Sequence, residues 1–405
     1  MKILIAHNTY EYPGGEDVVA EQEAALLRSH GHTVVEYRRS NRELRADGLW
    51  NKFAAPQRVT WARDTVRELG VLMRQEKPQI AHFHNTFAMI SPAAYGACKR
   101  AGIPVVQTLH NYRLLCPRSD FFRAGRACEA CLHTRTPWPG IVHGCYRQSR
   151  AQTAVVALML TAHRWLQTWQ TQVDLYVTPT EFVRQKYIAG GFPAQKIVVK
   201  PHFVSSPSEP PQKHKKYALF VGRLSQEKNV LGLLSAWEAA CAVPLKVIGS
   251  GPEESAVREL IHQRNLTNVE LVGPRSHEQV LTLMQNAQFL VSPTHLYETF
   301  GLVAIEAFAC GVPVIASRRG AIAEIVADGH IGVLFDPDVE GDLAAKVRWA
   351  TTHPEAMADM GKNARSVYEE KYTPEVNYKL LLSIYERAIR EIDLREIYND
   401  VRISS

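Results

Sequence analysis

Two glutamates separated by seven residues form the clearest chemical pattern in the chain. Glu298 and Glu306 lie in segment 295–311, HLYETFGLVAIEAFACG, soon after the apolar run 289–292, which is typical of a buried strand. A carboxylate can accept hydrogen bonds from two adjacent sugar hydroxyls. The pair therefore indicates a site for a polyhydroxylated ligand beyond the end of that strand.

The residues between the two glutamates add phosphate chemistry. We expect a helix to begin at about Thr299, so the backbone N–H groups of Phe300, Gly301 and Leu302 would lie at its N-terminus. Such N–H groups have no partner within the helix and bind phosphate well. Two unrelated surface glutamates would not explain why strand, turn, glycine and helix occur in this order.

A pair of cations follows an earlier strand. Arg223 and Lys228 lie in segment 220–229, FVGRLSQEKN, where Gly222 permits a tight turn. The planar fork of arginine and the point charge of lysine can clamp a diphosphate and neutralise charge on a leaving group. Without the glutamate motif, such a pair is more often a solvated surface.

Glycine-rich turns and histidines end other strands. Gly249 and Gly251 follow the strand at 245–248, while Gly14 and Gly15 follow the first strand and offer N–H groups to a phosphate or an acceptor. Both segments are also compatible with ordinary turns. His110 lies just past the strand at 105–109, where it is either a functional group or a structural histidine. His82 and His84 end the strand at 80–83 and suggest a polar acceptor pocket rather than a metal pair.

The order of these segments predicts an α/β protein with two domains. Strand and helix signals alternate in two series, which are separated by the Pro-, Ser- and Lys-rich stretch 205–216. We expect one domain at 1–204 and a second at 217–375, with a cleft between them. The carboxyl ends of the strands of both domains would line this cleft. A C-terminal helix and tail at 376–405 are expected to pack back on the first domain.

These motifs resemble the signature of retaining glycosyltransferase family 4, over nearly the whole chain. The resemblance rests on Glu298-x7-Glu306 with its Phe-Gly pair, and on the G-R-L-x-x-x-K-N run that ends at Asn229. It implies the GT-B fold of two Rossmann-like domains. It further implies that Arg223 and Lys228 hold the donor diphosphate, that Glu298 binds the sugar hydroxyls and that Glu306 binds the ribose.

The same resemblance assigns roles to the other motifs. The turn with Gly249 and Gly251 would line the nucleotide pocket, and His110, in a Thr-x-His element, would lie beside the donor sugar and the reacting carbon. The implied reaction transfers a hexose-type sugar, with retention, from a UDP- or GDP-type donor without a catalytic metal. The implied acceptor is a lipid-linked or polysaccharide glycan, as in exopolysaccharide or lipopolysaccharide assembly. An epimerase, a phosphorylase or an inactive binding homologue on the same fold remain alternatives.

Four of the seven cysteines are clustered. Their spacing, C-x11-C-x2-C-x13-C within an insertion at about 113–147, is compatible with a tetrahedral structural zinc site formed by Cys116, Cys128, Cys131 and Cys145. His133 and His143 are alternative ligands, and a set of reduced or partly paired thiols is the alternative to zinc. The remaining cysteines, Cys98, Cys241 and Cys310, lie in apolar contexts typical of a core.

Composition and charge limit the class of protein. The 405 residues are 46% apolar and 22% charged, as in ordinary globular proteins, and the apolar start MKILIAHNTY is too short for a signal peptide. We therefore expect a cytoplasmic protein. Residues 1–200 hold 26 basic and 15 acidic side chains, against 21 and 26 in the rest. This basic half favours an anionic partner, but no nucleic-acid module is recognisable.

One apolar helix suggests contact with a membrane surface. The segment 151–166 is too short to span a bilayer and has Trp165 and Trp169 at and just beyond its end, with arginines around it. The aromatic and basic stretch 49–53 has a similar character. Peripheral binding to an anionic cytoplasmic membrane face is one interpretation, and burial against the sheet is the other.

Overall fold

The computed structural model describes residues 1–11, 14–43, 56–206, 216–240 and 243–403 of the chain. These residues form two compact units. Unit 1 contains Met1–Phe121, Glu129–Lys200 and Tyr378–Ser405, and unit 2 contains Phe122–Cys128 and Pro201–Asn377. The stretch 49–53, Cys241 and most of the expected linker at 205–216 lie outside the described residues.

Unit 1 is built on a six-stranded parallel sheet with the order β2-β1-β3-β4-β7-β8. Its strands are β1 Lys2–Thr9, β2 Thr33–Ser40, β3 Ile80–Phe83, β4 Val105–Thr108, β7 Leu175–Thr178 and β8 Ile197–Val199. All were predicted from apolar runs, because the strands of a parallel sheet are buried on both faces. The strand order reverses between β1 and β3, so the loops after these two strands lie side by side.

Unit 2 repeats this architecture with the order β11-β10-β9-β12-β13-β14. Its strands are β9 Tyr217–Val221, β10 Leu245–Ile248, β11 Val269–Gly273, β12 Ala287–Ser292, β13 Val314–Ser317 and β14 Gly332–Phe335. Here the order reverses between β9 and β12. The loops after these strands carry the two strongest sequence motifs, and the topology brings them together.

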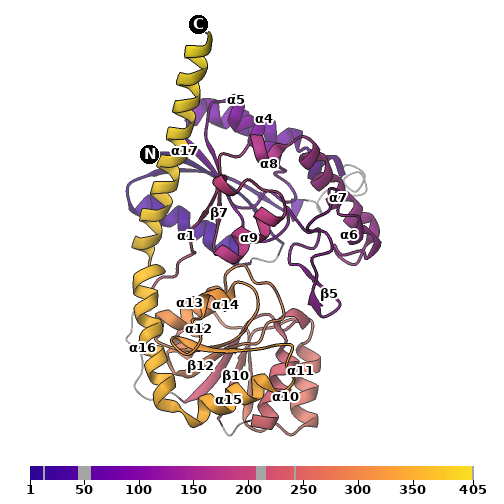
Figure 1. Cartoon of the computed structure of the whole chain (residues 1–405), viewed down its shortest axis with the longest axis vertical. Coiled ribbons are helices and arrows are strands. Elements are labelled where there is room, and N and C mark those ends of the chain that lie inside the picture. The colour runs from indigo at the N-terminus through magenta and orange to yellow at the C-terminus, as the bar shows by residue number, and fades with distance from the viewer. Residues whose placement is uncertain (12–13, 44–55, 207–215, 241–242, 404–405) are drawn as a thin grey trace. The chain divides into compact units, whose positions relative to one another are not determined.

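Helices flank each sheet (Figure 1). In unit 1 they are α1 Gly15–Ser29, α4 Arg63–Glu76, α5 Ala94–Arg100, α6 Trp138–Val142, α7 Arg150–Trp165, α8 Thr168–Thr171 and α9 Glu181–Ala189. In unit 2 they are α10 Val230–Ala240, α11 Glu254–Gln263, α12 His277–Gln285, α13 Leu302–Ala309, α14 Ile322–Ile325, α15 Asp342–Thr352 and α16 Pro354–Lys371, with the short turn η2 Gln226–Lys228. Aliphatic side chains from both helices and strands form the cores.

The C-terminal helix α17, Pro374–Ile403, belongs mainly to unit 1 (Figure 1). Leu381, Ile384 and Tyr385 are buried in one cluster with Ile3 and other residues of the first sheet. This confirms that the helix packs back on the N-terminal domain. It extends further than the sequence indicated, because the polar final residues lack the apolar periodicity that marks a helix.

One local prediction was wrong in detail. The helix expected to begin at Thr299 begins at Leu302, because its N-cap Gly301 has a φ of 96°, outside the helical region. The cysteine-rich insertion forms α6 and a short hairpin, β5 Phe122–Arg123 and β6 Arg126–Ala127, and this hairpin groups with unit 2.

Helix α7 presents its apolar residues in two directions. Val156, Ala157 and Leu160 are fully buried, whereas Leu158 is 54% exposed and Trp165 at its end is 77% exposed. Trp169 is completely buried, which corrects its assignment to a surface. Within the described ranges, none of the helices has the length and hydropathy needed to cross a membrane.

The turn after β10 depends on a residue without a side chain. Gly249 has a φ of 137°, and a Cβ atom there would lie 1.9 Å from the carbonyl oxygen of Gly222. We predict that Gly249→Ala destabilises unit 2 by about 3 kcal/mol, from the positive φ and the forced backbone shift together. Gly329→Ala is the control, because Gly329 has a φ of 74° but open space around it. Urea unfolding should show a clearly smaller loss for the control, and equal losses would contradict the close packing at Gly249.

Candidate functional site

In unit 2, the reversal of strand order places the two charged motifs in contact. Lys228, at the end of η2, forms an ion pair with Glu298, which lies in the loop after β12. The Lys228 side chain is 30% exposed and that of Glu298 is 10% exposed. The ammonium group therefore keeps access to solvent, where an anionic ligand can replace the carboxylate as its partner.

Backbone hydrogen bonds hold these two loops together. The carbonyl oxygen of Glu227 accepts from the backbone N–H of His295 at 2.9 Å and from the Thr294 hydroxyl at 3.0 Å. Ser225 donates to the Glu227 carboxylate at 2.8 Å. Glu227 thus fixes the position of its neighbour Lys228 relative to Glu298.

The glycine-rich turn after β10 packs against the loop after β9. Gly222 donates to the carbonyl of Ile248 at 3.0 Å, and Leu224 donates to the carbonyl of Ser250 at 3.0 Å. A Cβ atom on Gly251 would lie 2.3 Å from the carbonyl oxygen of Leu224. Gly249 and Gly251 therefore permit close backbone packing, while the neighbouring Arg223 side chain is exposed.

The start of α13 supplies backbone donors beside Glu298. A Cβ atom on Gly301 would lie 3.4 Å from a Glu298 carboxylate oxygen, so backbone and carboxylate are close. Phe300 is 3% exposed and packs edge-on against His202, which anchors the turn. Thr299 is half-buried. The first N–H groups of the helix, including that of Leu302, have no intrahelical partners and suit a phosphate.

Glu306 lies on α13, where burial dominates its chemistry. Its side chain is 12% exposed, and Nδ1 of His277 lies 3.5 Å from its carboxylate. Burial raises the pKa of Glu306 to about 7. A ligand hydroxyl donating to this carboxylate would stabilise the ionised form, so the group is suited to bind a diol.

In unit 1, His110 follows β4 and is half-buried. Its Nε2 lies 3.0 Å from Nδ1 of His84. The next residue, Asn111, donates to Glu16 of α1 at 3.2 Å. Burial raises the pKa of Glu16 to about 7, and sequence reasoning missed this carboxyl group because it stands in a polar helix start.

The glycine pair in the first loop is held by a carboxylate. Asp17 accepts from the backbone N–H of Gly14 at 2.6 Å, and its other oxygen lies 2.8 Å from Nε2 of His7. This hydrogen bond already uses the Gly14 N–H group, which was predicted to approach a phosphate. Gly15 begins α1, so its N–H group belongs to the first turn of that helix.

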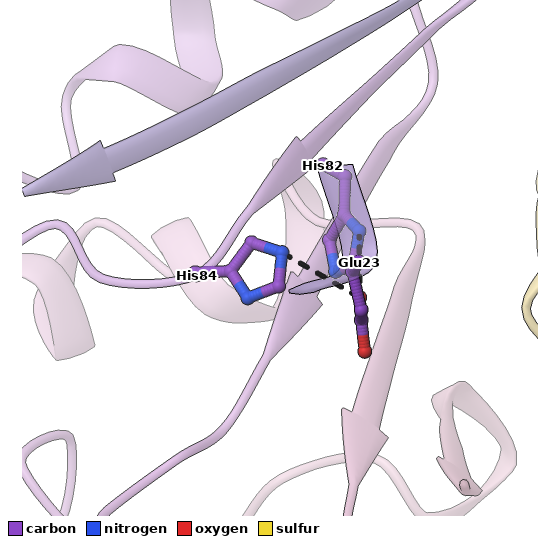
Figure 2. Close-up of side chains that lie close together, drawn as sticks. All are labelled: Glu23, His82 and His84. Atoms are coloured by element: carbon purple, nitrogen blue, oxygen red, sulfur yellow. Dashed lines mark ion pairs between the residues drawn. The ribbon is translucent and has the colours of Figure 1, made fainter. Parts of the chain in front are cut away.

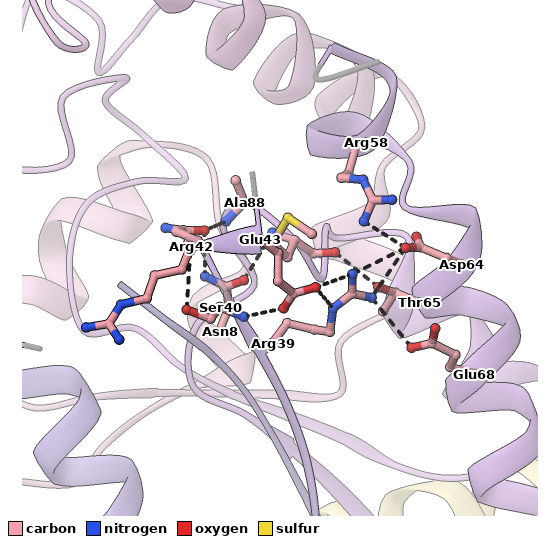
Figure 3. Close-up of polar contacts among 12 residues, drawn as sticks. Asn8, Arg39, Ser40, Arg42, Glu43, Arg58, Asp64, Thr65, Glu68 and Ala88 are labelled. Carbon is pink, nitrogen blue, oxygen red and sulfur yellow. Dashed lines mark hydrogen bonds and ion pairs between the residues drawn. The ribbon is translucent and has the colours of Figure 1, made fainter. Parts of the chain in front are cut away.

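Asn8, near the end of β1, has a structural role. Asn8 is fully buried, donates to the carbonyl of Phe87 at 2.6 Å and accepts from the backbone N–H of Met89 at 3.1 Å. Figure 3 shows Asn8 near a cluster in which Arg39 of β2 contacts Glu43 and Asp64. These contacts hold the loops after β1, β2 and β3 in place.

His82 and His84 do not line an acceptor pocket, because both side chains are fully buried with Glu23 of α1 (Figure 2). Their ligand atoms lie close enough to surround one ion. However, Lys200 Nζ lies 2.7 Å from Glu23, and both nitrogens of His82 contact hydroxyls, of Tyr385 and Thr108, at 2.7 Å. An ammonium ion beside the carboxylate and a fully bonded imidazole fit a hydrogen-bonded network better than a metal site.

The zinc site predicted for the cysteine cluster stays a prediction. Cys116 and Cys131 are buried, while Cys128 and Cys145 are half-buried. Among the described residues, the one group with metal-ligand spacing is that of Glu23 and the two histidines, and none of these four thiols belongs to it. The Cys128 sulfur instead accepts from Arg123 within the hairpin at 3.5 Å. Cys98 and Cys310 are core residues, as expected.

The raised pKa of Glu306 predicts a pH-dependent stability. Between pH values of about 4.5 and 7 the folded state holds a proton that the unfolded state has lost, so stability falls as pH rises through this window. We expect Glu306→Gln to raise the free energy of unfolding by on the order of 3 kcal/mol at pH 8 and to change it little at pH 5. Thermal unfolding across this range checks the difference, with Glu278→Gln on exposed α12 as the control. A difference between wild type and Glu306→Gln that does not change with pH would contradict a buried carboxyl.

Comparison with known proteins agrees with this geometry. Residues 13–206 match the family model Glycosyltransferase Family 4, and residues 204–367 match Glycosyl transferases group 1. An uncharacterized glycosyltransferase of Methanocaldococcus jannaschii is 32% identical over 170 residues, which are 42% of this chain and 48% of that protein. A 2-deoxystreptamine N-acetyl-D-glucosaminyltransferase of Niallia circulans is 31% identical over 185 residues, which are 44% of this chain and 47% of that protein. The chain thus spans less than half the length of these relatives.

Solved structures share the fold. Anabaena HepE in complex with UDP superposes with a TM-score of 0.67 and 18% identity, over 95% of this chain and 100% of that chain. Sucrose-phosphate synthase from Thermosynechococcus elongatus superposes with a TM-score of 0.69 and 18% identity, over 100% of both chains. These structures show that the chain has the GT-B fold, and the two family matches show that it belongs to glycosyltransferase family 4.

Proposed function

We propose that the protein transfers a hexose-type sugar from a UDP- or GDP-type nucleotide sugar to a glycan acceptor, with retention of anomeric configuration. The observation that carries this proposal is the contact between Lys228 and Glu298 beside the start of α13. A cation for phosphate, a carboxylate for hydroxyls and helix N–H groups thus occur together at the ends of two neighbouring strands, β9 and β12. The solved relative HepE, which was crystallised with UDP, supports this class of donor.

Each group in unit 2 has a role in the proposed reaction. The acceptor oxygen bonds to the anomeric carbon while the bond from that carbon to the β-phosphate oxygen breaks. Arg223, Lys228 and the N–H groups of Gly301 and Leu302 stabilise the negative charge that develops on the diphosphate. Glu298 accepts from sugar hydroxyls, and Glu306 accepts from the ribose. The departing phosphate takes the acceptor proton on the same face.

We further propose that unit 1 contributes His110 as a catalytic residue. We also propose that the reaction uses no catalytic metal. Two cationic side chains and a helix N-terminus supply the positive charge that a divalent ion provides in other transferases. The acceptor class we propose is a lipid-linked or polysaccharide glycan. Epimerisation of the donor, phosphorolysis, and donor binding without turnover are the competing functions, and the products distinguish them.

A donor panel tests the proposed function. The protein is incubated with UDP-, GDP-, ADP- and dTDP-sugars, with and without glycan acceptors and with and without a chelator, and nucleoside diphosphate and glycoside are measured. We expect one nucleotide to be released with an α-linked product. Arg223→Ala, Lys228→Met and Glu298→Gln should each lower kcat by roughly 10²–10³, as removal of one charge-stabilising donor does.

Lys246→Met is the matched control for these variants. Lys246 also pairs with a glutamate in unit 2, Glu270, but it lies on β10 away from the two loops of the site. Its kcat should stay near that of the wild type. Unchanged turnover in all three site variants would refute the assignment, and epimerised donor or sugar phosphate would identify a competing reaction.

We also propose that unit 1 binds an anionic membrane surface. Exposed apolar side chains lie on α6 and α7, with Trp138 at 60% and Trp165 at 77% exposure, and the exposed Arg147 and Arg150 lie at the start of α7. The packing of α6 against α7 keeps these residues on neighbouring helices (Figure 1). Aromatic and cationic side chains together favour the interface of an anionic bilayer.

Vesicle sedimentation tests this surface. We expect binding to phosphatidylglycerol-containing vesicles that weakens in salt, and little binding to phosphatidylcholine alone. The double substitution Trp138→Ser and Trp165→Ser should lower the partition coefficient for the vesicles by more than tenfold, since each buried aromatic contributes on the order of 1–2 kcal/mol. Val339→Ser, which changes a side chain 55% exposed in unit 2, should have no effect. Equal binding by both variants would exclude this surface.

A further inference from the structure

His110 is one end of a buried chain of polar contacts. Its Nε2 lies 3.0 Å from Nδ1 of His84, and Nε2 of His84 lies 3.6 Å from the Glu23 carboxylate. The other oxygen of Glu23 accepts from Lys200 at 2.7 Å. The side chains of His84, Glu23 and Lys200 have no exposed surface, so water does not compete for these contacts.

The protonation of His84 follows from its surroundings. Burial, together with the neighbouring imidazoles and the positive charge of Lys200, holds the pKa of His84 well below its ordinary value. His84 is therefore neutral and carries one N–H group, either on Nδ1 or on Nε2. Which nitrogen carries it determines the direction of the hydrogen bond to His110.

The carboxylate of Glu23 decides between these two forms. An ionised carboxylate accepts hydrogen bonds and never donates them. A lone pair on Nε2 of His84 would face a negative oxygen, whereas an N–H group there is attracted to it. The proton of His84 is consequently on Nε2, and Nδ1 is left as an acceptor toward His110.

We propose that His84 is a positioning residue that fixes His110 as the Nε2–H tautomer. His110 donates from Nε2 to Nδ1 of His84, so neutral His110 has its lone pair on Nδ1. This nitrogen then accepts a hydrogen bond from a hydroxyl group of a ligand. The consequence for turnover rests on the proposed function, but the tautomer itself does not.

Nitrogen NMR of the full-length protein measures the tautomer directly. Histidine-¹⁵N-labelled protein is studied at about pH 8.5, well above the ordinary histidine pKa of ~6.5. The signals of His110 are assigned by their loss in His110→Asn. We expect a pyrrole-like Nε2 and a pyridine-like Nδ1 for His110. The opposite pattern would overturn the proposal, whatever the activity of the protein.

Substitutions at His84 test the consequence for turnover. His84→Phe removes the acceptor and should lower kcat roughly tenfold or more, while the KM for the donor changes less. His84→Asn retains an acceptor oxygen near the position of Nδ1 and should recover most of that loss, together with the tautomer signal. If His84→Asn restores neither kcat nor the tautomer signal, the hydrogen bond is not the cause of the loss.

Tyr385→Phe is the matched control. Tyr385 of α17 contacts the same cluster through His82 and not through His84. Loss of the Tyr385 hydroxyl should lower the stability of the protein but leave the His110 signals and kcat unchanged. A change in both the signals and kcat would indicate instead that any disturbance of the cluster has this effect. If glycosyl transfer is absent while the Nε2–H signal is present, the proposed function fails and the tautomer assignment holds.

Discussion

The buried ion pair between Glu23 and Lys200 is the constraint on which unit 1 depends. Both side chains are fully buried, and removing one partner of such a pair typically costs about 3–5 kcal/mol because the other charge remains unpaired. Glu23 comes from α1 and Lys200 from the residue after β8. Two distant segments must therefore stay in register. His82 attaches α17 to the same cluster through Tyr385.

Unit 2 has an ion pair with the opposite property at the reversal of its strand order, between the loops after β9 and β12. Lys228 is 30% exposed, so water already screens its attraction to Glu298. Exposed pairs contribute only about 0–1 kcal/mol, and exchange of the carboxylate for a diphosphate costs correspondingly little. The buried pair of unit 1 has no such freedom. One pair is suited to hold side chains in place, and the other is suited to change partners.

The sequence allowed the strands and the reversal points to be anticipated better than the side-chain contacts. Every predicted strand was found, because an apolar run between turns leaves few alternatives in a parallel sheet. Glu298 and Lys228 were selected by motif, and their contact follows from strand order. The start of α13 was misplaced because propensity does not reveal that Gly301 adopts a positive φ. The cysteine spacing was compatible with zinc, yet spacing constrains distance only weakly in a loop.

The polar network of unit 1 left a signal in the sequence that was overlooked. Glu23 stands four residues after Val19 and four before Leu27, both buried, so it occupies the apolar stripe of α1. A carboxylate in such a stripe requires a buried partner. The partner, Lys200, is 177 residues away, and no local pattern connects them. A charged residue at a core position of an amphipathic helix is thus evidence for a distant polar contact, and here that contact lies behind the histidine proposed to act in the reaction.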